Sequence, residues 1–290
     1  MLNIIVAPNS INRNGEKITK RVVRFLKNEK VDFSVYFSST INEVSSHTLQ
    51  LIDAGETDYV IIGGDAIISE FINSVKDLSK IKLGIIPTNK SDDLASYLNL
   101  EHNPISAIRM IIQGNIERID VLLMNDKRVV NNILIGASTV LEEIVSQYKV
   151  QNGITRNYAL LKYGSKFDGI DLKIESKNQK IITDNIFELS ISNGGKSNGR
   201  QVSPLANMHD GLFNFNYVST PQREHKKRYL RLFKRGNQIY DDQTKQSWLN
   251  NIKITNPDNK IKAVVDGKVM TVDSMNISIL EKVLKIYKTN

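Results

Sequence analysis

A short apolar segment that ends in Gly-Gly-Asp constrains the fold of this chain most. Residues 60–62 are Val, Ile and Ile, and Gly63, Gly64 and Asp65 follow them directly. A fully apolar run of this length is typical of a central parallel strand that is covered on both faces. Glycines after such a strand let the backbone approach a phosphate closely, because no Cβ atom stands in the way. The segment therefore predicts an α/β sheet with a strand-to-helix turn suited to a phosphate group.

Strand-like and helix-like segments alternate on both sides of this turn. Hydrophobic periodicity predicts strands over residues 2–7, 31–37, 58–62 and 82–86. It predicts helices over residues 16–30, 42–54, 94–98 and 105–113, with a further helix around Phe71 and Val75. Alternation of this kind predicts a three-layer, doubly wound α/β domain.

The pattern changes after residue 125. Short runs of Val, Ile, Phe and Thr are separated there by clusters of Asn, Gly, Asp and Lys, which is typical of antiparallel strands joined by turns. One helix is expected near residues 141–147. We predict an α/β domain over residues 1–122, to which the tail 277–290 returns, and an antiparallel β-sandwich domain over residues 123–276.

Composition excludes several classes of protein. The chain has no cysteine, which excludes disulfides and thiolate metal sites, and its four histidines lack metal-ligand spacing. No apolar run approaches the ~18–20 residues that span a bilayer. The first six residues predict a strand and not a signal peptide, because they lack a basic leading segment. The sequence also contains neither the GxGxxG nor the GxxxxGK[ST] phosphate-binding pattern.

The net charge of +8 indicates acidic partners, and much of this charge is local. Seven lysines and arginines lie between Arg223 and Arg235, against one Glu224, while Tyr229, Leu230 and Phe233 recur at helical spacing. A basic amphipathic helix of this kind either packs its apolar side on its own domain or docks on an anionic membrane. We favour packing, and we expect no nucleic-acid partner because no recognition motif accompanies the helix.

Three further motifs give the Gly-Gly-Asp turn a context. Pro87 opens a loop that ends in Asp92-Asp93-Leu94-Ala95. Residues 192–195 are Ser-Asn-Gly-Gly, residues 203–206 are Ser-Pro-Leu-Ala, and Asp210-Gly211 follows. Residues 264–268 are Val-Val-Asp-Gly-Lys. In this order and at these separations, the whole chain resembles the bacterial diacylglycerol kinases and the sphingosine-kinase-like lipid kinases.

The resemblance implies a fold and an activity. The fold is an NAD kinase/diacylglycerol kinase-like α/β domain that binds nucleotide, followed by a β-sandwich domain that binds lipid. The activity is transfer of the γ-phosphoryl group of ATP to the hydroxyl of a diacylglycerol-like lipid, with Mg²⁺ as cofactor. Such an enzyme would act in phospholipid metabolism, in the cytoplasm or peripherally at the inner membrane face. A homodimer is left open.

The resemblance also assigns roles to individual residues. Asp266 takes the place of the family's catalytic base, with Lys268 beside it, and a base of this kind accepts the hydroxyl proton during in-line transfer. The nucleotide-binding positions are Ser39, Thr40, Gly63, Gly64, Asp65 and Lys90. The positions expected to hold the metal are Asp65, Asp93 and Asp120. Glu70 matches the family's glutamate on the helix that follows the turn.

Several positions depart from the family, and most of them lie in the nucleotide motifs. The family's Gly-Gly-Asp-Gly-Thr ends here in Ala66-Ile67, and its early Asn-Pro is Ala7-Pro8. The Gly-Thr of the loop after Pro87 is replaced by Asn89-Lys90. Lys268 replaces the glutamate of Asp-Gly-Glu. If residues 266 and 268 lie on one strand, they face the same way and the lysine stands beside the base.

The alternatives for these residues are structural. Asp65 and Asp93 suit helix N-caps, and Thr40 suits the N-cap of the helix that follows it. Asp210-Gly211 and Asp266-Gly267 suit hairpin turns. At the level of function, the alternative is a catalytically impaired relative that binds lipid or nucleotide and regulates another process. A third reading is a kinase for a soluble phosphorylated substrate, with Lys90 and Lys268 as an anion clamp.

Overall fold

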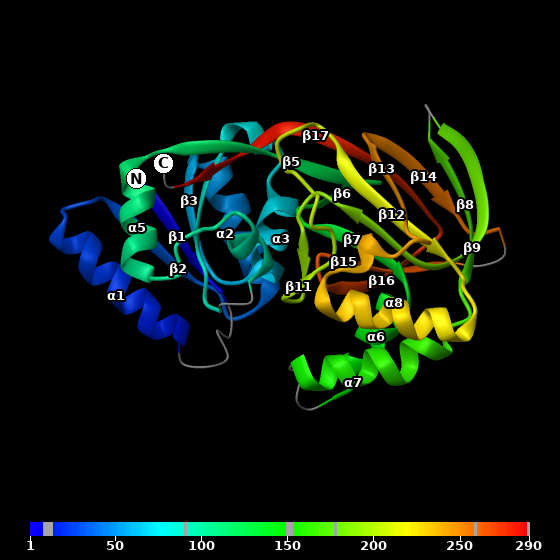
Figure 1. Cartoon of the computed structure of the whole chain (residues 1–290). Coiled ribbons are helices and arrows are strands. Elements are labelled where there is room, and N and C mark those ends of the chain that lie inside the picture. The colour runs from blue at the N-terminus through cyan, green and yellow to red at the C-terminus, as the bar shows by residue number, and fades with distance from the viewer. Residues whose placement is uncertain (8–13, 90–91, 149–152, 177–178, 258–259, 289–290) are drawn as a thin grey trace. The chain divides into compact units, whose positions relative to one another are not determined.

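The computed structural model describes residues 1–7, 14–89, 92–148, 153–176, 179–257 and 260–288 (Figure 1). These residues divide into two compact units. The first unit contains Met1–Asp120 and Glu281–Asn290, and the second contains Val121–Leu280. Each unit has its own helices and strands and its own buried apolar residues.

The first unit alternates strands and helices, as predicted. Its elements are β1 (Leu2–Val6), α1 (Asn14–Asn28), β2 (Phe33–Phe37), α2 (Ile41–Asp53), β3 (Asp58–Ile62), α3 (Asp65–Ser74), η1 (Leu78–Lys80), β4 (Lys82–Ile86), α4 (Asp93–Tyr97), α5 (Pro104–Gln113) and the start of β5 (Ile116–Met124). Their order and bounds confirm the doubly wound fold class.

Parallel strands form the centre of the first unit. The order is β4-β3-β1-β2, with Val60 opposite both Ile4 of β1 and Gly84 of β4. The end of strand β17 (Ser274–Tyr287) adds a parallel neighbour, because Ile286 lies opposite Leu83 of β4. These central strands carry the apolar runs of the sequence because both of their faces are buried.

Helices cover both faces of this sheet. Val22 and Leu26 of α1 and Ile108 of α5 share one apolar cluster with the strand residues Ile4 and Ile62. On the other side α2 packs against α3. The ring of Phe71 on α3 lies 5.1 Å from that of Tyr59 on β3. The first unit is thus a three-layer α/β structure (Figure 1).

The second unit is rich in antiparallel strands. Its elements are the end of β5, β6 (Lys127–Val129), β7 (Asn132–Gly136), α6 (Ala137–Ser146), α7 (Gly153–Tyr163), η2 (Gly164–Lys166), β8 (Ile170–Ser176), β9 (Gln179–Ser192), β10 (Lys196–Ser197), β11 (Arg200–Gln201), β12 (Phe213–Ser219), α8 (Arg223–Arg235), η3 (Gln238–Tyr240), β13 (Lys245–Leu249), β14 (Asn251–Thr255), β15 (Ile261–Val265), β16 (Lys268–Val272) and the start of β17. Helix α7 is a long element that the periodicity of the sequence did not predict.

Four of these strands form a continuous antiparallel surface. Val264 of β15 lies opposite Leu134 of β7, Leu134 opposite Ser190 of β9, and Ser190 opposite Asn216 of β12. Helices α6, α7 and α8 lie together over one face of these strands (Figure 1), around a buried cluster that includes Phe187. The other face carries a larger apolar cluster. The fold class predicted for this part of the chain is also confirmed.

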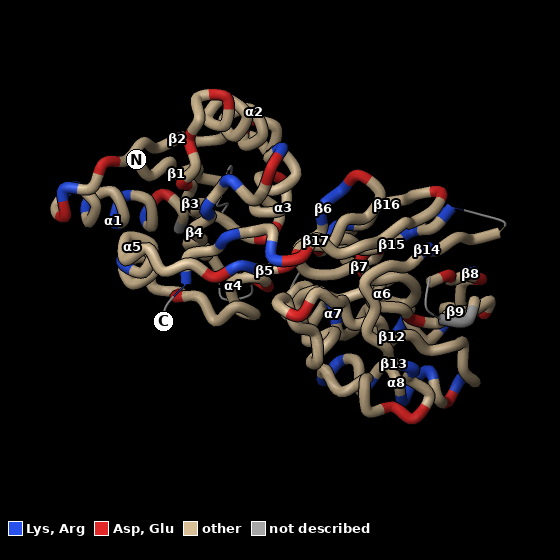
Figure 2. The backbone as a smooth tube through the Cα atoms, turned by 90° about the horizontal axis from the view of Figure 1, so that it is seen from above, with Lys and Arg blue, Asp and Glu red and all other residues tan. Residues whose placement is uncertain are grey.

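The basic segment forms α8, and its apolar side packs on its own unit. Tyr229, Leu230 and Phe233 are buried in the cluster beneath the helix. Lys226 is buried as well, and its ammonium donates to the carbonyl of Phe167 at 2.7 Å. The other lysines and arginines of α8, which are among the blue segments of Figure 2, are exposed. None of the described helices is both long and apolar enough to cross a bilayer.

Candidate functional site

The Gly-Gly-Asp turn lies at the point where the sheet of the first unit changes direction. The chain passes from β1 outward to β2, and then returns to the other side of β1 to form β3 and β4. In open α/β sheets, ligands bind outside the carboxyl ends of the strands at such a switch point. Those ends are Ala7 after β1 and Gly63 after β3, held together because the Ala7 N–H donates to the Ile62 carbonyl at 3.0 Å.

Gly64 has no room for a side chain. A Cβ atom at this position would lie 2.8 Å from the Asp92 carboxylate. Its backbone is extended, with φ −103°, so crowding and not conformation requires the glycine. Gly64 is the N-cap of α3 and has no capping side chain, and its carbonyl accepts from the Ile68 N–H at 3.3 Å. The first turn of α3 thus presents backbone N–H groups at the end of β3, an arrangement that suits an anion.

Asp65 does not cap its own helix. Its carboxylate accepts from the backbone N–H of Asp93 at 2.6 Å and from that of Leu94 at 3.0 Å. It therefore ties the start of α4 to the start of α3, and the alternative that Asp65 is an N-cap is wrong. Asp93 is likewise the first residue within α4, after the N-cap position at Asp92.

Asp92 is a member of this site that the motifs did not single out. Its carboxylate accepts from the N–H groups of Thr88 and Asn89, both at 3.0 Å, and so closes the loop after β4. Burial is the main reason why the pKa of Asp92 is raised. The N–H donor of Asn89 opposes this rise, and the nearby charge of Asp65 adds to it. The position of Asp92, four residues after Thr88 at the start of a helix, is the sequence signal for this role.

Apolar side chains crowd the other glycine of the turn. A Cβ atom at Gly63 would lie 3.1 Å from the Cβ atom of Ala7 and 3.4 Å from that of Ile67. Both neighbours are departures from the family motif, and Ile67 is buried. The surface that Gly63 leaves open for a ligand is therefore partly lined by the aliphatic side chains of Ala7 and Ile67.

The remaining nucleotide-binding candidates lie at the start of α2 or outside the described residues. Thr40 is the N-cap of α2, because its hydroxyl accepts from the Glu43 N–H at 3.2 Å, which confirms that alternative. The N–H of Ser39 donates to the Glu43 carboxylate at 2.6 Å. Glu70 on α3 accepts from the hydroxyl of Ser45. Lys90 lies outside the described residues.

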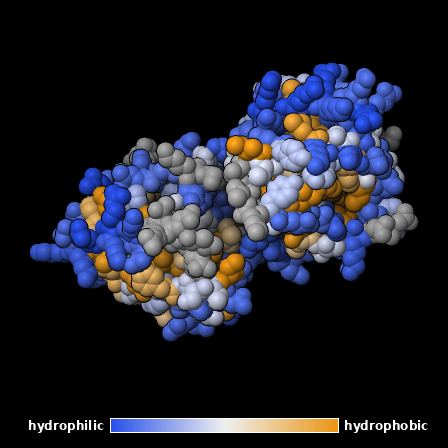
Figure 3. All heavy atoms as spheres, turned by 90° about the horizontal axis from the view of Figure 1, so that it is seen from below, coloured by the Kyte–Doolittle hydropathy of each residue, from blue (hydrophilic) through white to orange (hydrophobic). Residues whose placement is uncertain are grey.

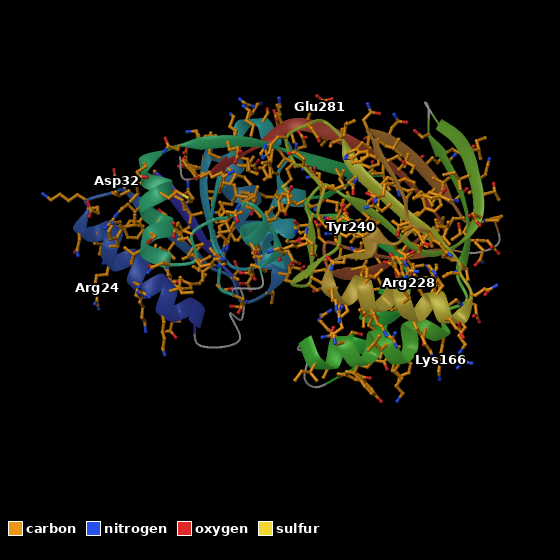
Figure 4. The ribbon with its side chains drawn as sticks, viewed as in Figure 1. Arg24, Asp32, Lys166, Arg228, Tyr240 and Glu281 are labelled. Atoms are coloured by element: carbon orange, nitrogen blue, oxygen red, sulfur yellow. The ribbon has the colours of Figure 1, made fainter. Side chains whose placement is uncertain are left out.

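The three metal-ligand candidates do not form a cluster in the part of the chain that the structure describes. Asp120 is fully buried on β5, and its carboxylate accepts from the Lys282 N–H at 2.6 Å. Among the described residues, three or more ligand atoms within 4.8 Å of one another occur only at His225, Asp241 and Asp242. That set lies in the second unit beside Arg228 (labelled in Figure 4), whose guanidinium is 3.6 Å from Asp242 and already supplies positive charge.

Asp266 and Gly267 form the hairpin turn between β15 and β16. Their φ angles are +43° and +78°, so both residues adopt the left-handed conformation of a type I′ turn. The expectation that residues 266 and 268 share one strand is therefore wrong. Lys268 instead begins β16, opposite Val265, and its side chain is exposed.

The Asp266 carboxylate is held by backbone donors that are distant in sequence. One oxygen accepts from the Val130 N–H at 2.9 Å. The other accepts from Asn131 at 2.8 Å and from Asn132 at 3.3 Å. The backbone N–H of Asp266 also donates to the Asn132 carbonyl at 3.1 Å. Asp266 is thus a buried, oriented carboxylate at a hairpin turn, and the structural alternative for this residue is confirmed.

Asn193 supports the same segment from the opposite side. Its side-chain amide donates to the Val130 carbonyl at 2.9 Å, and its backbone N–H donates to the Asn131 carbonyl at 2.9 Å. The residues that hold Asp266 are therefore fixed by the Ser-Asn-Gly-Gly motif. Asn193 thus has a positioning role. The order of the motifs indicated that this segment belongs to the site, but it did not identify this role.

Residues 1–124 match the family model of the diacylglycerol kinase catalytic domain. The diacylglycerol kinase of Staphylococcus saprophyticus subsp. saprophyticus is 25% identical over 207 residues, which cover 69% of this chain and 68% of that protein. The diacylglycerol kinase of Staphylococcus aureus strain Newman is 24% identical over 209 residues, covering 69% and 66%. The match thus spans about two thirds of each relative's length, and the resemblance predicted from the motifs is confirmed.

Solved structures share the fold over nearly the whole chain. A diacylglycerol kinase from Bacillus anthracis str. Sterne superposes with a TM-score of 0.76 at 16% identity, over 99% of this chain and 96% of that one. An NAD kinase from Archaeoglobus fulgidus in complex with ATP gives a TM-score of 0.52 at 12% identity, over 99% and 94%. At these identities the likeness establishes the fold alone.

Proposed function

We propose, on the premise that this chain is a relative of the diacylglycerol kinases, that it is an ATP-dependent lipid kinase. It would transfer the γ-phosphoryl group to the hydroxyl of a diacylglycerol-like lipid. One observation carries this proposal: the Gly63-Gly64-Asp65 turn lies at the switch point of the sheet, where α3 presents its N-terminus. That position and that chemistry suit the phosphates of a nucleotide.

The carboxylates beside the turn fit a divalent cation held through water. Asp65 lies close enough to Asp92 for its charge to raise the pKa of that group, after the larger effect of burial. Neighbouring carboxylates of this kind attract Mg²⁺, which usually keeps several of its waters. Asp65 and Asp93 would hold the ion, which neutralises charge on the transferred phosphoryl group. Asp120, the third position expected to hold the metal, would contribute its carboxylate from a buried position on β5.

Asp266 would accept the proton of the lipid hydroxyl. Three backbone donors fix its carboxylate, so the acceptor oxygen is oriented before the substrate arrives. Lys268 would contact the anionic groups of the reactants, and Ser39, Thr40 and Lys90 would contribute to nucleotide binding.

Phosphoryl transfer from radiolabelled ATP to lipid alcohols in mixed micelles tests this function. We expect Mg²⁺-dependent labelling of a diacyl lipid alcohol, and a loss of at least about 10²-fold for Asp266→Asn, the range for a general base. Thermal unfolding of that variant must be measured in parallel, because an amide in place of the carboxylate faces backbone donors with its own NH₂ group. Failure of the folded wild-type protein to label any lipid alcohol would contradict the proposal.

Helix α7 supports docking of the second unit on an anionic membrane. Ile154, Tyr158 and Leu161 recur at helical spacing on α7, and their side chains are 79%, 54% and 40% exposed. Lys162 lies on the same helix and contacts the Tyr158 ring, and the exposed Lys166 ends the turn that follows the helix. Figure 3, viewed from the side on which α7 lies in Figure 1, shows hydrophobic patches among hydrophilic surface. An exposed apolar stripe flanked by lysines suits the interface of an anionic bilayer.

Sedimentation with lipid vesicles tests the docking surface. The wild-type protein is expected to bind vesicles with anionic lipid more tightly than neutral ones, and less tightly as salt is raised. The double variant Ile154→Ser, Leu161→Ser is expected to lose most of this binding. Ile112→Ser, which alters an exposed apolar residue of the first unit, is the matched control. Equal binding of all three proteins would argue against α7 as the docking element.

The packing of Ile67 supports the alternative of a catalytically impaired relative. Its side chain lies against Gly63, where the family has a threonine, and no hydroxyl is available there. Calorimetric titration with ATP distinguishes the two functions. Tight, Mg²⁺-dependent binding supports the kinase, and absence of binding supports a regulatory protein that retains only the lipid-binding part.

A further inference from the structure

A charged hollow adjoins the Asp266–Gly267 turn within the second unit. It has a volume of about 940 Å³ and lies between helix α6, the start of α7 and the hairpin of β15 and β16. Five charged side chains line it: Glu142, Glu143, Arg156, Lys262 and Lys268. The hollow therefore carries three cations and two carboxylates beside the residue proposed as the base.

Two of the three cations are already neutralised. Arg156 pairs with Glu142, and less than a fifth of either side chain is exposed. The Lys262 ammonium lies 2.7 Å from the Glu143 carboxylate. The Lys268 ammonium makes no hydrogen bond or ion pair with another described residue, so the surplus positive charge of the hollow resides on it. An unpaired ammonium at the edge of a hollow attracts an anion.

An amide donor lacks a partner in the same place. The Asn198 side chain lines the hollow, and its Nδ2 atom is buried without a hydrogen-bond acceptor among the described residues. Its oxygen and nitrogen lie 3.4 and 3.6 Å from the position that a Cβ atom of Gly267 would occupy. A buried donor without an acceptor is costly, and an anionic oxygen would satisfy it.

We propose that this hollow binds a phosphate group carried by the acceptor, so that the preferred acceptor is an alcohol that already bears a phosphate ester. The inference rests on the proposed kinase function and narrows its substrate class. In the reaction, the acceptor hydroxyl oxygen bonds to the γ-phosphorus while the bond from that phosphorus to the departing ADP oxygen breaks. The hydroxyl proton passes to Asp266. Lys268 and Asn198 hold the phosphate ester that is already present and so position the hydroxyl.

A comparison of three acceptors tests the inference with the full-length protein. Diacylglycerol is the neutral lipid, phosphatidylglycerol is the lipid with a phosphate ester, and glycerol 3-phosphate is the soluble alcohol with the same group. We expect kcat/KM for a phosphate-bearing acceptor to exceed that for diacylglycerol at least tenfold. A preference for phosphatidylglycerol identifies a lipid headgroup as the source of the phosphate, and a preference for glycerol 3-phosphate identifies a soluble substrate.

Variants at Lys268 connect this preference to the hollow. Lys268→Glu is expected to lower the ratio of kcat/KM for the phosphate-bearing acceptor to kcat/KM for diacylglycerol at least tenfold, whatever it does to ATP binding in both reactions. Lys268→Gln should fall between the two proteins. Lys260→Glu is the matched control, because this exposed lysine precedes β15 and does not line the hollow. Since Lys268 is exposed, unchanged thermal unfolding of each variant is expected and is to be verified.

The outcomes separate the inference from the function on which it rests. One outcome overturns the anionic subsite and leaves the kinase function intact. In that outcome kcat/KM for diacylglycerol equals or exceeds that for both phosphate-bearing acceptors, and Lys268→Glu does not change the ratio between them. Absence of transfer to all three acceptors removes the kinase function itself.

Discussion

At the scale of single residues, the turn after β3 depends on close contacts between side chains and backbone. Gly64 faces the Asp92 carboxylate, which in turn closes the loop after β4. Asp65 joins the starts of α3 and α4 through two backbone donors. The Asp65 carboxylate is thus tied to the segment after β4, and Gly64 of the turn after β3 lies against the Asp92 carboxylate, so the two loops of the candidate site are coupled.

Gly64→Ala tests this coupling. The new methyl group must displace Asp92, and overpacking of this kind costs about 1–3 kcal/mol. We expect faster amide hydrogen exchange in α3 and α4 of the variant. In the double variant Gly64→Ala, Asp92→Ala the collision is absent, so the added cost of the alanine at 64 should nearly vanish. An unchanged cost in the Asp92→Ala background would contradict the contact.

At the scale of elements, α8 illustrates how a strongly basic helix is anchored in its own unit. Three of its apolar side chains enter the cluster beneath it, and Lys226 enters with them. The Lys226 ammonium reaches the Phe167 carbonyl and lies 5.6 Å from the centre of the Phe187 ring. The buried side of this helix therefore includes a cation with a defined partner, and the remaining charge points outward.

Lys226→Met is expected to destabilise the second unit by about 1–3 kcal/mol, because it leaves the Phe167 carbonyl without its donor. Trp248, the one tryptophan of the sequence, lies on β13 of this unit, so its fluorescence during urea unfolding reports the change. Lys227→Met alters the exposed neighbour on the same helix and should stay within about 0.5 kcal/mol. Equal effects of the two substitutions would mean that the buried ammonium contributes nothing specific.

At the scale of the whole molecule, a buried carboxylate links stability to pH. Glu188 is fully enclosed on β9, and burial raises its pKa to about 8 against the opposing donors of Ser138. Because the folded pKa lies above the unfolded value of about 4.5, the folded state binds more protons between these two values. The free energy of unfolding then falls as pH rises through this window and levels off above it.

We expect the wild-type second unit to lose stability between pH 5 and pH 8, by an amount on the order of 4 kcal/mol from Glu188. Glu188→Gln, which cannot ionise, should lose much less over the same range. Urea unfolding followed by Trp248 fluorescence at several pH values measures both. Glu281→Gln, which alters an exposed carboxylate (Figure 4), should follow the wild type. A flat profile for the wild type would show that Glu188 ionises without penalty.

The sequence by itself determined the local structure and the fold class. A period of 3.6 residues predicted the helices of the first unit, because each helix buries a regular stripe. Short apolar runs predicted its central strands, because both faces of these strands are buried. The N-cap at Thr40, the basic helix α8 and the turn at Asp266-Gly267 followed from residue types that favour those conformations. The family resemblance followed from motifs in their order along the chain.

Only the tertiary structure decided which groups those residues meet. Helix α7 escaped prediction because Ile154, Tyr158 and Leu161 are exposed while Ala159 and Leu160 are buried, so no simple apolar stripe marks its buried side. The donors of Asp266 lie more than 130 residues away, and Ile67 meets Ala7 across Gly63. Such contacts depend on how strands pair and how loops meet at the end of a sheet. The residues nearby in sequence therefore do not predict them.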